Sequence, residues 1–216
     1  MNILIMGPAG SGKGTMSSNI VDEFNIVHIS TGDMFRSAIA NGTPVGLEAK
    51  SYMDNGNLVP DDVTDRMVKE RISQPDCVNG FLLDGYPRNI NQAHAIEEMA
   101  AEIGKPIDLV INLNVDYNTL VTRITGRRIC KTCGAIYHIT NKPSKIEGKC
   151  DIDGGELYQR SDDTEEKLKI RYNEYVEQTE PSIEYFKSKG LVRDIDADRS
   201  AEDVMKDVRE VLESVK

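Results

Sequence analysis

A glycine-rich loop directly after a short apolar run is the feature that most constrains the fold of this chain. The run "NILIM" passes into "GPAGSGKGT", and a stretch with helical spacing follows. A strand that breaks into a glycine loop before a helix brings backbone N–H groups and a helix N-terminus together, and phosphate oxygens bind at such a place. Because both flanks have the expected character, we predict a site for a nucleoside triphosphate or similar polyphosphate rather than a plain turn.

The loop has the spacing Gly7-x4-Gly12-Lys13, in which glycines let the backbone approach phosphate and the lysine reaches the outer phosphate groups. Gly14 follows the lysine where the general motif has Ser or Thr, and the hydroxyl comes one place later, at Thr15. The glycines, the lysine and the hydroxyl of the motif are therefore all present, and only the hydroxyl is shifted by one position.

Apolar runs alternate with helical patterns along most of the chain. The further apolar runs are residues 26–30, 80–85, 108–115 and 191–195. Helical spacing covers residues 15–24, 31–41, 61–73, 91–103, 117–127, 164–187 and 201–215. Strands that alternate with helices predict an α/β fold, a doubly wound parallel sheet flanked by helices, in which ligands bind at the carboxyl ends of the strands.

Two segments do not fit this alternation, and we interpret them as inserts on a sheet core. Residues 30–60 carry extra helical stretches, and residues 127–161 are rich in Gly, Cys, Lys and Asp without a helical period. The core is then formed by residues 1–29, 61–126 and 162–216.

Charge and cysteine content limit the partners and the compartment. The chain has 216 residues and a net charge of −10, so nucleic acid and anionic lipid are not expected to bind, and any polyanion must be met by clustered Arg and Lys. The first residues, "MNILIMGPAG", have no basic flank and too short an apolar run for a signal peptide or a membrane span. Four cysteines in such a chain are expected to be reduced, so we expect a cytoplasmic protein. Cys77, in a loop-like stretch, is expected to be a free thiol.

The segment "CKTCGAIYHITNKPSKIEGKCDID" predicts a metal site. Cys130-x2-Cys133 and Cys150-x2-Asp153 offer three thiolates and one carboxylate, which suit tetrahedral Zn²⁺. His138 is the rival fourth ligand, but the repeated spacing favours Asp153. A closed four-ligand site has no open position for substrate, and so short a segment cannot bury a core of its own, so we expect structural zinc. The alternative is a group of free cysteines without metal.

Several motifs together resemble one family. They are the displaced hydroxyl at Thr15, "STGDMFR" (30–36), "GFLLDGYPR" (80–88) and "GRR" (126–128). With them the chain resembles the adenylate kinases, in the longer bacterial form whose lid carries a metal-binding knuckle, nearly from end to end. The resemblance implies reversible phosphoryl transfer from ATP to AMP, with Mg²⁺ on the nucleotides. It also implies a P-loop core with a helical monophosphate-binding insert and a small, β-rich, zinc-binding lid that moves.

Such a reaction needs positive charge more than it needs a general base. The acceptor phosphate is already largely ionised near neutral pH, because its second pKa is about 6. The task is to bring two polyanions together and to stabilise charge on the transferring group, for which Arg, Lys, Mg²⁺ and exclusion of water are suited. By resemblance, the catalytic residues are Lys13, Arg88, Arg127, Arg160 and Arg171.

The resemblance also assigns residues to two nucleotide sites. For ATP these are Gly10, Ser11, Gly12, Lys13, Gly14, Thr15, Arg123, Arg127, Ile136, Tyr137 and Arg199. For AMP they are Thr31, Arg36, Asn57, Leu58, Val59, Gly85, Tyr86, Pro87, Arg88, Gln92, Arg160 and Arg171. Arg36 and Arg88 would hold the monophosphate, and Arg123 would pack against the ATP adenine. From the residues alone, Thr31 could equally be a helix N-cap and Gln92 a solvated helix residue.

Asp84 is the first candidate for holding magnesium, through water, because Mg²⁺ commonly keeps several of its waters when it binds to protein. It ends an apolar strand beside the predicted phosphate loop, where ligands of parallel sheets bind. An ordinary turn aspartate is the alternative. Asp33 is a second candidate, or simply a residue of the first turn of a helix.

Other activities are compatible with parts of this pattern. A kinase for another nucleoside monophosphate and one that uses GTP as donor are the rival enzymes. A nucleic-acid-binding zinc-ribbon NTPase is a rival of a different class, and the net charge of −10 argues against it. We expect a monomer whose partners are ATP, AMP and ADP, and whose turnover is limited by opening of the two inserts.

Overall fold

The structure is a computed structural model that describes residues 1–55 and 57–215. Gly56, in the predicted insert 30–60, and Lys216, at the end of the segment 162–216, lie outside the described residues. A five-stranded parallel sheet forms the centre, in the order β2-β3-β1-β4-β8. Its strands are β1 (Asn2–Met6), β2 (Val27–Ser30), β3 (Phe81–Asp84), β4 (Leu109–Asn114) and β8 (Val192–Asp196).

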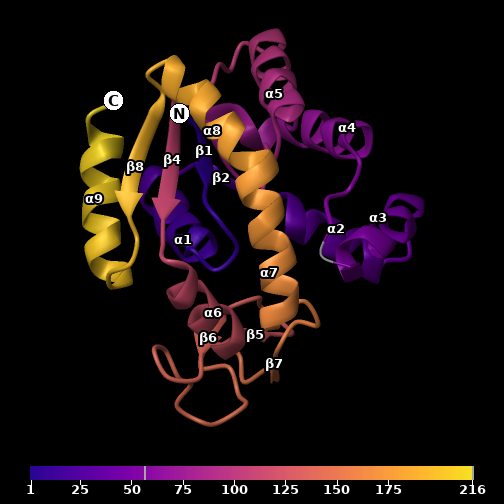
Figure 1. The fold of residues 1–216 in the computed structure, drawn as a ribbon, viewed down its shortest axis with the longest axis vertical. Coiled ribbons are helices and arrows are strands. Elements are labelled where there is room, and N and C mark those ends of the chain that lie inside the picture. Colours follow the sequence, from indigo (N-terminus) through magenta and orange to yellow (C-terminus); the bar gives the residue numbers. More distant parts are fainter. Residues whose placement is uncertain (56, 216) are drawn as a thin grey trace.

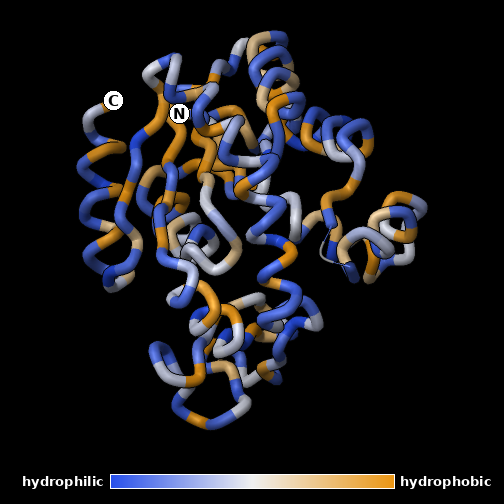
Figure 2. Tube along the Cα trace, viewed as in Figure 1, coloured by the Kyte–Doolittle hydropathy of each residue, from blue (hydrophilic) through white to orange (hydrophobic). Residues whose placement is uncertain are grey.

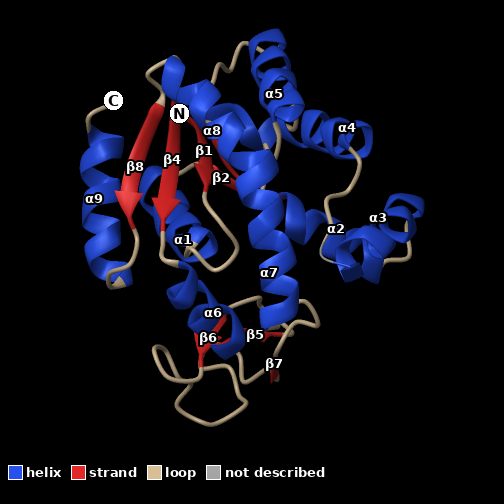
Figure 3. Ribbon diagram, viewed as in Figure 1, coloured by secondary structure: helices blue, strands red, loops and turns tan. Residues whose placement is uncertain are grey.

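Helices surround this sheet (Figures 1 and 3). The helices that follow or cover its strands are α1 (Lys13–Phe24), α4 (Asp61–Ile72), α5 (Ile90–Glu102), α6 (Tyr117–Gly126), α7 (Glu165–Glu174), α8 (Glu180–Ser188) and α9 (Ala201–Glu213). A short 3-10 turn, η1 (Pro75–Asn79), precedes β3 and holds Cys77, which is buried rather than in an open loop. The predicted α/β fold with a doubly wound parallel sheet is confirmed. Among the described helices, none is both long and apolar enough to cross a membrane.

The alternation of side chains along β1 explains the two-sided core. Ile3 and Ile5 belong to a cluster with residues of α1 and α9, whereas Leu4 and Met6 belong to a second cluster with residues of α4, α5 and α8. All four side chains are buried. A parallel strand covered on both faces reads as one continuous apolar run, which is why "NILIM" shows no polar alternation. Figure 2 shows hydrophobic segments along the strands of the sheet.

The first insert packs beside the core as two helices, α2 (Thr31–Ala40) and α3 (Pro44–Asn55). Its small core is formed by Phe35, Ala49 and Val59 together with Val63 of α4. Gly46 is required where the helices meet, because an added Cβ would lie 2.2 Å from the Ala38 backbone.

The second insert contains a three-stranded antiparallel sheet in the order β6-β5-β7. Its strands are β5 (Arg127–Cys130), β6 (Ile136–His138) and β7 (Leu157–Tyr158). The chain enters it from α6 and leaves it into α7, and Figure 1 shows it beyond the carboxyl ends of β4 and β8. We call this segment the lid. The limits that we predict for core, insert and lid stay an interpretation of this layout.

The helix predicted over residues 164–187 is interrupted by a π-helical turn, η2 (Tyr175–Thr179), between α7 and α8. Pro181 has no N–H to donate within the helix, and the Glu180 N–H bonds to the Tyr175 carbonyl oxygen five residues back. The helix therefore continues in direction but shifts the faces on which its later side chains lie.

Candidate active site

The loop between β1 and α1 is shaped to receive an anion. Gly12 has a φ of 101°, and an added Cβ there would meet no atom within 4 Å. No side chain caps α1, so its first N–H groups remain for a ligand. Gly7 has a φ of 135°, and a Cβ would lie 2.7 Å from the Leu113 carbonyl oxygen. Ser11 Oγ is buried without a hydrogen-bond partner among the described residues, so it is left to bind a phosphate oxygen.

Lys13 begins α1, and its side chain folds back over the loop. Its Nζ donates to the carbonyl oxygens of Gly7 (2.8 Å) and Pro8 (2.9 Å). Burial lowers the pKa of Lys13 to about 8, a shift that Asp84 opposes and Arg88 reinforces. Arg171 and Arg127 lower the pKa as well, so three arginines and one carboxylate act on this ammonium group.

Two arginines reach the same region from different elements. Arg88 follows β3; its Nε donates to the Gly85 carbonyl oxygen (2.8 Å), and its own carbonyl accepts from Thr179 Oγ1 (2.8 Å). Arg171 projects from α7, with its Nη1 3.1 Å from an Asp162 carboxylate oxygen. Burial lowers the pKa of both guanidinium groups, as expected for cations held largely out of water.

The lid contributes two further arginines. Arg127 begins β5 and forms an ion pair with Asp163, whose side chain is 0% exposed. Arg160 lies 3.5 Å from Asp33 of the insert, and its Nε is buried without a partner among the described residues. Burial lowers the pKa of Arg160 to about 10, and the positive charges of Arg36 and Arg127 add to this. Cations that repel one another thus lie close together, and an anionic ligand bound between them would offset the repulsion.

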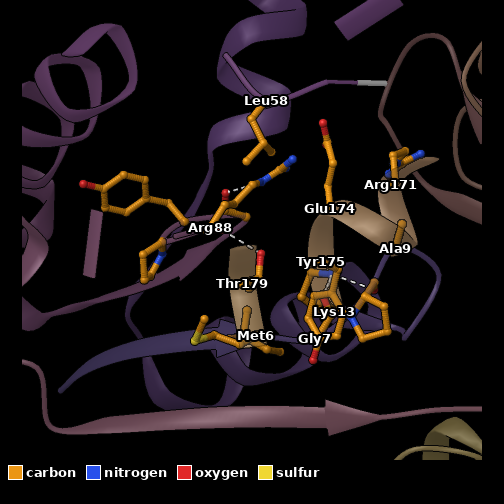
Figure 4. Close-up of a pocket in the computed structure, with 15 residues that line it drawn as sticks. Met6, Gly7, Ala9, Lys13, Leu58, Arg88, Arg171, Glu174, Tyr175 and Thr179 are labelled. Atoms are coloured by element: carbon orange, nitrogen blue, oxygen red, sulfur yellow. Dashed lines mark hydrogen bonds between the residues drawn. The ribbon is translucent and has the colours of Figure 1, made fainter. Parts of the chain in front are cut away.

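A cavity of about 550 Å³, counting its open mouth, lies where Lys13, Arg88 and Arg171 meet. Its walls come from the end of β1, the phosphate loop, residues 85–88 and the helix from α7 into η2. Among its described lining residues Glu174 is the one acidic side chain, and Figure 4 shows it between Arg88 and Arg171. Burial raises the pKa of Glu174, while Arg88 acts in the opposite direction. Lys13, Arg88 and Arg171 line the cavity as well, so its wall carries more basic than acidic side chains.

The monophosphate side is built by the insert and the loop after β3. Thr31 Oγ1 donates to the Gly85 carbonyl oxygen (2.9 Å), which ties α2 to that loop. Ser30, not Thr31, caps α2, because its side chain accepts from the Asp33 N–H. Arg36 lies on the same helix, with its Nη2 2.6 Å from Asp33. Thr31 is therefore free of the capping role, and its hydroxyl instead joins α2 to the loop after β3.

Gln92 lies in the first turn of α5, and it is not a solvated helix residue. Its side chain is 2% exposed. Its Oε1 accepts from the Arg88 N–H (2.8 Å), and its Nε2 donates to Asp61 (2.7 Å). The structure therefore ties Gln92 directly to the backbone of an arginine in the cavity wall.

The side predicted for the ATP base lies between α6, the phosphate loop and the segment after β8. Arg123 of α6 donates from Nη2 to the Ala197 carbonyl oxygen (2.7 Å), and its Nη1 lies 3.4 Å from the Ser11 carbonyl oxygen. These bonds fix the guanidinium plane beside the loop. An added Cβ at Gly14 would lie 3.4 Å from Ile136 Cδ1, so strand β6 of the lid packs over the start of α1.

The lid also holds a candidate metal centre. Four side chains have ligand atoms within 4.8 Å of one another: Cys130, Cys133, Cys150 and Asp153. The Sγ atoms of Cys133 and Cys150 are 3.6 Å apart, and Cys130 Sγ lies 3.3 Å from Asp153 Oδ1. His138 is turned away from this group, with its Nε2 3.1 Å from a carbonyl oxygen of α6. Three sulfur atoms and a carboxylate oxygen fit a tetrahedral zinc ion, and the arrangement favours Asp153 over His138.

Comparison with known proteins identifies the family. A family model described as Adenylate kinase matches residues 5–191 of the chain. This chain belongs to the adenylate kinase family. The Adenylate kinase of Carboxydothermus hydrogenoformans is 53% identical over 213 residues, which are 99% of this chain and 100% of that protein. Those of Bacillus subtilis and Archaeoglobus fulgidus are 51% and 50% identical over 216 residues, which are 100% of both chains in each pair.

An adenylate kinase transfers a phosphoryl group reversibly from ATP to AMP and so produces two ADP, which keeps the adenine nucleotides in balance. The chain is a phosphotransferase of this kind. Adenylate kinases use their nucleotides together with Mg²⁺.

The two predicted magnesium carboxylates differ in their surroundings. Asp84 ends β3 near Lys13, and its Oδ2 lies 3.8 Å from His28 Nε2. Asp33 lies between Arg36 and Arg160. Burial works against ionisation of Asp33, but Arg36 prevails and holds its pKa below the usual value. Asp33 thus already has two arginine partners, whereas Asp84 lies at the carboxyl end of β3 near Lys13.

Two side chains predicted to touch ATP are directed elsewhere. The Tyr137 hydroxyl lies 3.4 Å from Cys150 Sγ, and the ring packs inside the knuckle. Arg199 donates from Nη2 to Asp207 and to the Asp196 carbonyl oxygen at the surface. Their place in an ATP site stays a prediction, and these side chains have protein partners in this structure. Only the backbone of Arg199 meets the site, where its carbonyl oxygen lies 3.4 Å from Arg123.

Two side chains predicted to touch AMP are also buried in protein. Tyr86 is 1% exposed within the core, and its hydroxyl donates to Asp65 (2.6 Å). Val59 packs in the small core of the insert. Tyr86 nevertheless lines the cavity, together with Leu58 and Pro87, whereas Val59 does not. A sequence motif predicts that a segment lies beside the ligand, but it does not predict which of the segment's side chains point toward the ligand.

Several residues of the site carry no sequence signal that we recognised. Asp163 holds Arg127, and Glu174, Tyr175 and Thr179 line the cavity. The latter three lie in a stretch with ordinary helical spacing. Glu174 ends α7, and Tyr175 and Thr179 are the first and last residues of the π-helical turn. The nearest available signal was Pro181, which marks the place where the helix cannot keep its normal hydrogen bonds.

Proposed function

We propose that phosphoryl transfer takes place in the cavity between the phosphate loop and Arg88, with ATP on the loop and lid side and AMP on the insert side. The observation that carries this proposal is the convergence of cationic groups from the core, the lid and α7. They are Lys13, Arg88, Arg127, Arg160 and Arg171. Cations that repel one another in the free protein are stabilised when two polyanions lie between them, and most of all when charge develops on the transferring group.

Each group has a separate task in the proposed mechanism. The N–H groups of the loop and Lys13 neutralise the outer phosphates of ATP. Arg36 and Arg88 hold the AMP phosphate, one of whose oxygens attacks the γ-phosphorus. As the new bond forms, the bond to the β-phosphate oxygen breaks and its electron pair leaves with ADP. Arg127, Arg160 and Arg171 contact the transferring group, and no side chain has to remove a proton because the acceptor is already ionised.

We assign the magnesium-holding role to Asp84. Its place at the carboxyl end of β3, beside the phosphate loop, suits a carboxylate that binds the ion through water. When bound, the ion neutralises phosphate charge. Asp84 also opposes the lowering of the Lys13 pKa, so the chain's own carboxylate helps to keep this lysine charged.

We further propose that the lid binds structural zinc through Cys130, Cys133, Cys150 and Asp153. The donor set supports zinc, and with all four positions filled by protein no position is open for substrate. The lid has few buried apolar side chains, so a metal would replace a missing core. The monomeric state, the cytoplasmic location and the lack of nucleic-acid binding stay predictions from composition and charge.

Formation of ADP from ATP and AMP, with Mg²⁺ present, tests the assignment of the site. Lys13→Ala and Arg88→Ala are each expected to lower kcat/KM by about a thousandfold, because each removes a charge at the reacting groups. Arg193→Ala, at an exposed arginine of β8, is the control and should leave the rate unchanged. Near-normal activity of either site variant would contradict the proposed residues. A panel of donors and acceptors that includes GTP and other monophosphates decides between ATP with AMP and the rival pairs.

A further inference from the structure

The side-chain amide of Gln92 is held in one orientation by two partners of opposite kind. The Arg88 backbone N–H donates to Oε1 (2.8 Å), and Nε2 donates to Asp61 Oδ1 (2.7 Å). A backbone N–H can only donate and a carboxylate can only accept, so these neighbours decide which end of the amide is the oxygen. Because the side chain is 2% exposed, water does not replace either partner. Reversal of the amide would leave two buried mismatches.

Asp61 is itself fixed in place. It is the first residue of α4, directly after the insert. The same Oδ1 that accepts from Gln92 also accepts from Asn89 Nδ2 (2.8 Å), and Asn89 caps α5 by accepting from the Gln92 N–H (2.9 Å). Asp61, Asn89 and Gln92 therefore form a closed network that joins the end of the insert to the start of α5, next to Arg88.

Each end of the fixed amide has one hydrogen-bonding position left for a ligand. Oε1 can accept one more hydrogen bond, and Nε2 can donate one more. The Watson–Crick edge of adenine offers an amino group at N6 and an acceptor at N1, which match this pair. Hypoxanthine and guanine offer an acceptor at O6 and a donor at N1, which match only the reversed amide. Reversal would set Nε2 against the Arg88 N–H and Oε1 against the Asp61 carboxylate.

We propose that Asp61 determines the preference of this enzyme for AMP over oxopurine monophosphates, by fixing the orientation of Gln92. Asp61 acts through Gln92 and is a positioning residue rather than a catalytic one. The inference rests on the proposed place of Gln92 in the AMP site. It adds a specific physical cause for base selection. A carboxylate at the junction of insert and core acts together with the Arg88 N–H to exclude the reversed orientation of the Gln92 amide.

The variant Asp61→Asn tests this directly. The asparagine has the same shape, but its amide offers either a donor or an acceptor to Gln92. Of the two mismatches that oppose reversal of Gln92, the one at residue 61 is removed and the one at the Arg88 N–H remains. The readout is the ratio of kcat/KM for AMP to that for inosine monophosphate, which carries hypoxanthine. We expect this ratio to fall by about tenfold or more. Asp62→Asn, at the exposed neighbouring carboxylate, is the matched control and should leave the ratio unchanged.

Two further variants keep the outcome decisive. In a Gln92→Ala background, Asp61→Asn should have no additional effect on the ratio, because its partner is gone. Asp61→Glu keeps the carboxylate and should keep the preference for AMP even if total activity falls, because a ratio of rates does not depend on the folded fraction.

An unchanged ratio in Asp61→Asn, with a lowered ratio in Gln92→Ala, would contradict the role of Asp61 but not that of Gln92. If Gln92→Ala changes neither the KM for AMP nor the ratio, the proposed AMP site itself is wrong.

Discussion

The ammonium group of Lys13 is held by two carbonyl oxygens of its own loop, and its pKa is about 8. Burial lowers this pKa most, Asp84 opposes the shift, and Arg88 reinforces it. A bound triphosphate raises the pKa again, because it brings negative charge to the same place. Below about pH 8 the group is already charged in the free protein, so the affinity for ATP should be constant. Above that pH binding must take up a proton, and the affinity should fall by up to about tenfold per pH unit.

Calorimetric titration with ATP across this pH range measures the effect. Repeating the titration in buffers of different ionisation enthalpy counts the protons taken up. The control is Lys13→Met, which should bind weakly and show no such step near pH 8. A constant affinity of the unaltered protein from neutral pH to well above pH 8 would show that Lys13 is charged throughout, against this interpretation.

The ion pair of Arg127 with Asp163 gives a prediction about stability. The Asp163 side chain is 0% exposed and that of Arg127 is 18% exposed. Asp163→Ala should lower the free energy of unfolding by about 3–5 kcal/mol, because a largely buried guanidinium group is left without its partner. Urea unfolding measures the change. Glu147→Ala, at an exposed lid carboxylate, should stay within about 0.5 kcal/mol of the unaltered protein. A similar small change for Asp163→Ala would show that Arg127 finds another partner.

The sequence predicted those residues whose type and local spacing carry the chemistry, and it missed those whose role depends on distant partners. The loop from Gly7 to Lys13 works through neighbouring backbone atoms, so its spacing was enough. Asp163 and Asp61 act only because folding brings Arg127 and Gln92 to them. Nothing in their sequence neighbourhood distinguishes such carboxylates from solvated ones.

At the scale of elements, the lid depends on its proposed metal. Metal analysis of the purified protein should find one zinc ion per chain, a ratio set by four protein ligands. Asp153→Ala should lower the zinc content, whereas His138→Ala should not, because His138 contacts α6 instead. Removal of zinc by a chelator should make residues 127–161 sensitive to protease before the core is cut. Full protection of the lid after complete chelation would contradict a structural metal.

The helix from α7 to α8 contains a feature that the sequence pattern did not predict. Periodicity predicted one helix over residues 164–187, and the direction of that helix is right. The π-helical turn at residues 175–179 could not be read from periodicity, because it inserts a residue into the turn without ending the helix. It places Tyr175 and Thr179 on the cavity wall, and Thr179 then bonds to the Arg88 backbone.

At the scale of the whole molecule, the insert is joined across the cavity to the lid and to α7. Arg160 of the lid lies 3.5 Å from Asp33, and Lys167 Nζ donates to the Asp54 carbonyl oxygen (2.8 Å). Products leave only when such contacts separate, so we expect opening rather than chemistry to limit turnover. Rapid mixing of enzyme with ATP and AMP should then give a burst of ADP before the steady state. A linear time course from the first turnover would show that chemistry is limiting.

The contact of Lys167 allows the same idea to be tested by substitution. Lys167→Met removes the bond between α7 and the end of α3, and it should raise kcat about twofold to fivefold while it raises the KM for AMP. Lys169→Met, at an exposed lysine of the same helix, is the control. A lower kcat in Lys167→Met would mean that this contact supports the reacting geometry instead of restraining release.

The central claim is that cations from separate parts of the chain meet on the phosphates of two nucleotides. The most direct measurement is a crystal structure with a bisubstrate mimic, in which two adenosines are joined by a chain of phosphates. We predict that the guanidinium groups of Arg88, Arg127, Arg160 and Arg171 lie within about 3 Å of phosphate oxygens, at charge-assisted hydrogen-bond distance. Arg88 and Arg160 directed into solvent, with the mimic bound, would contradict the account.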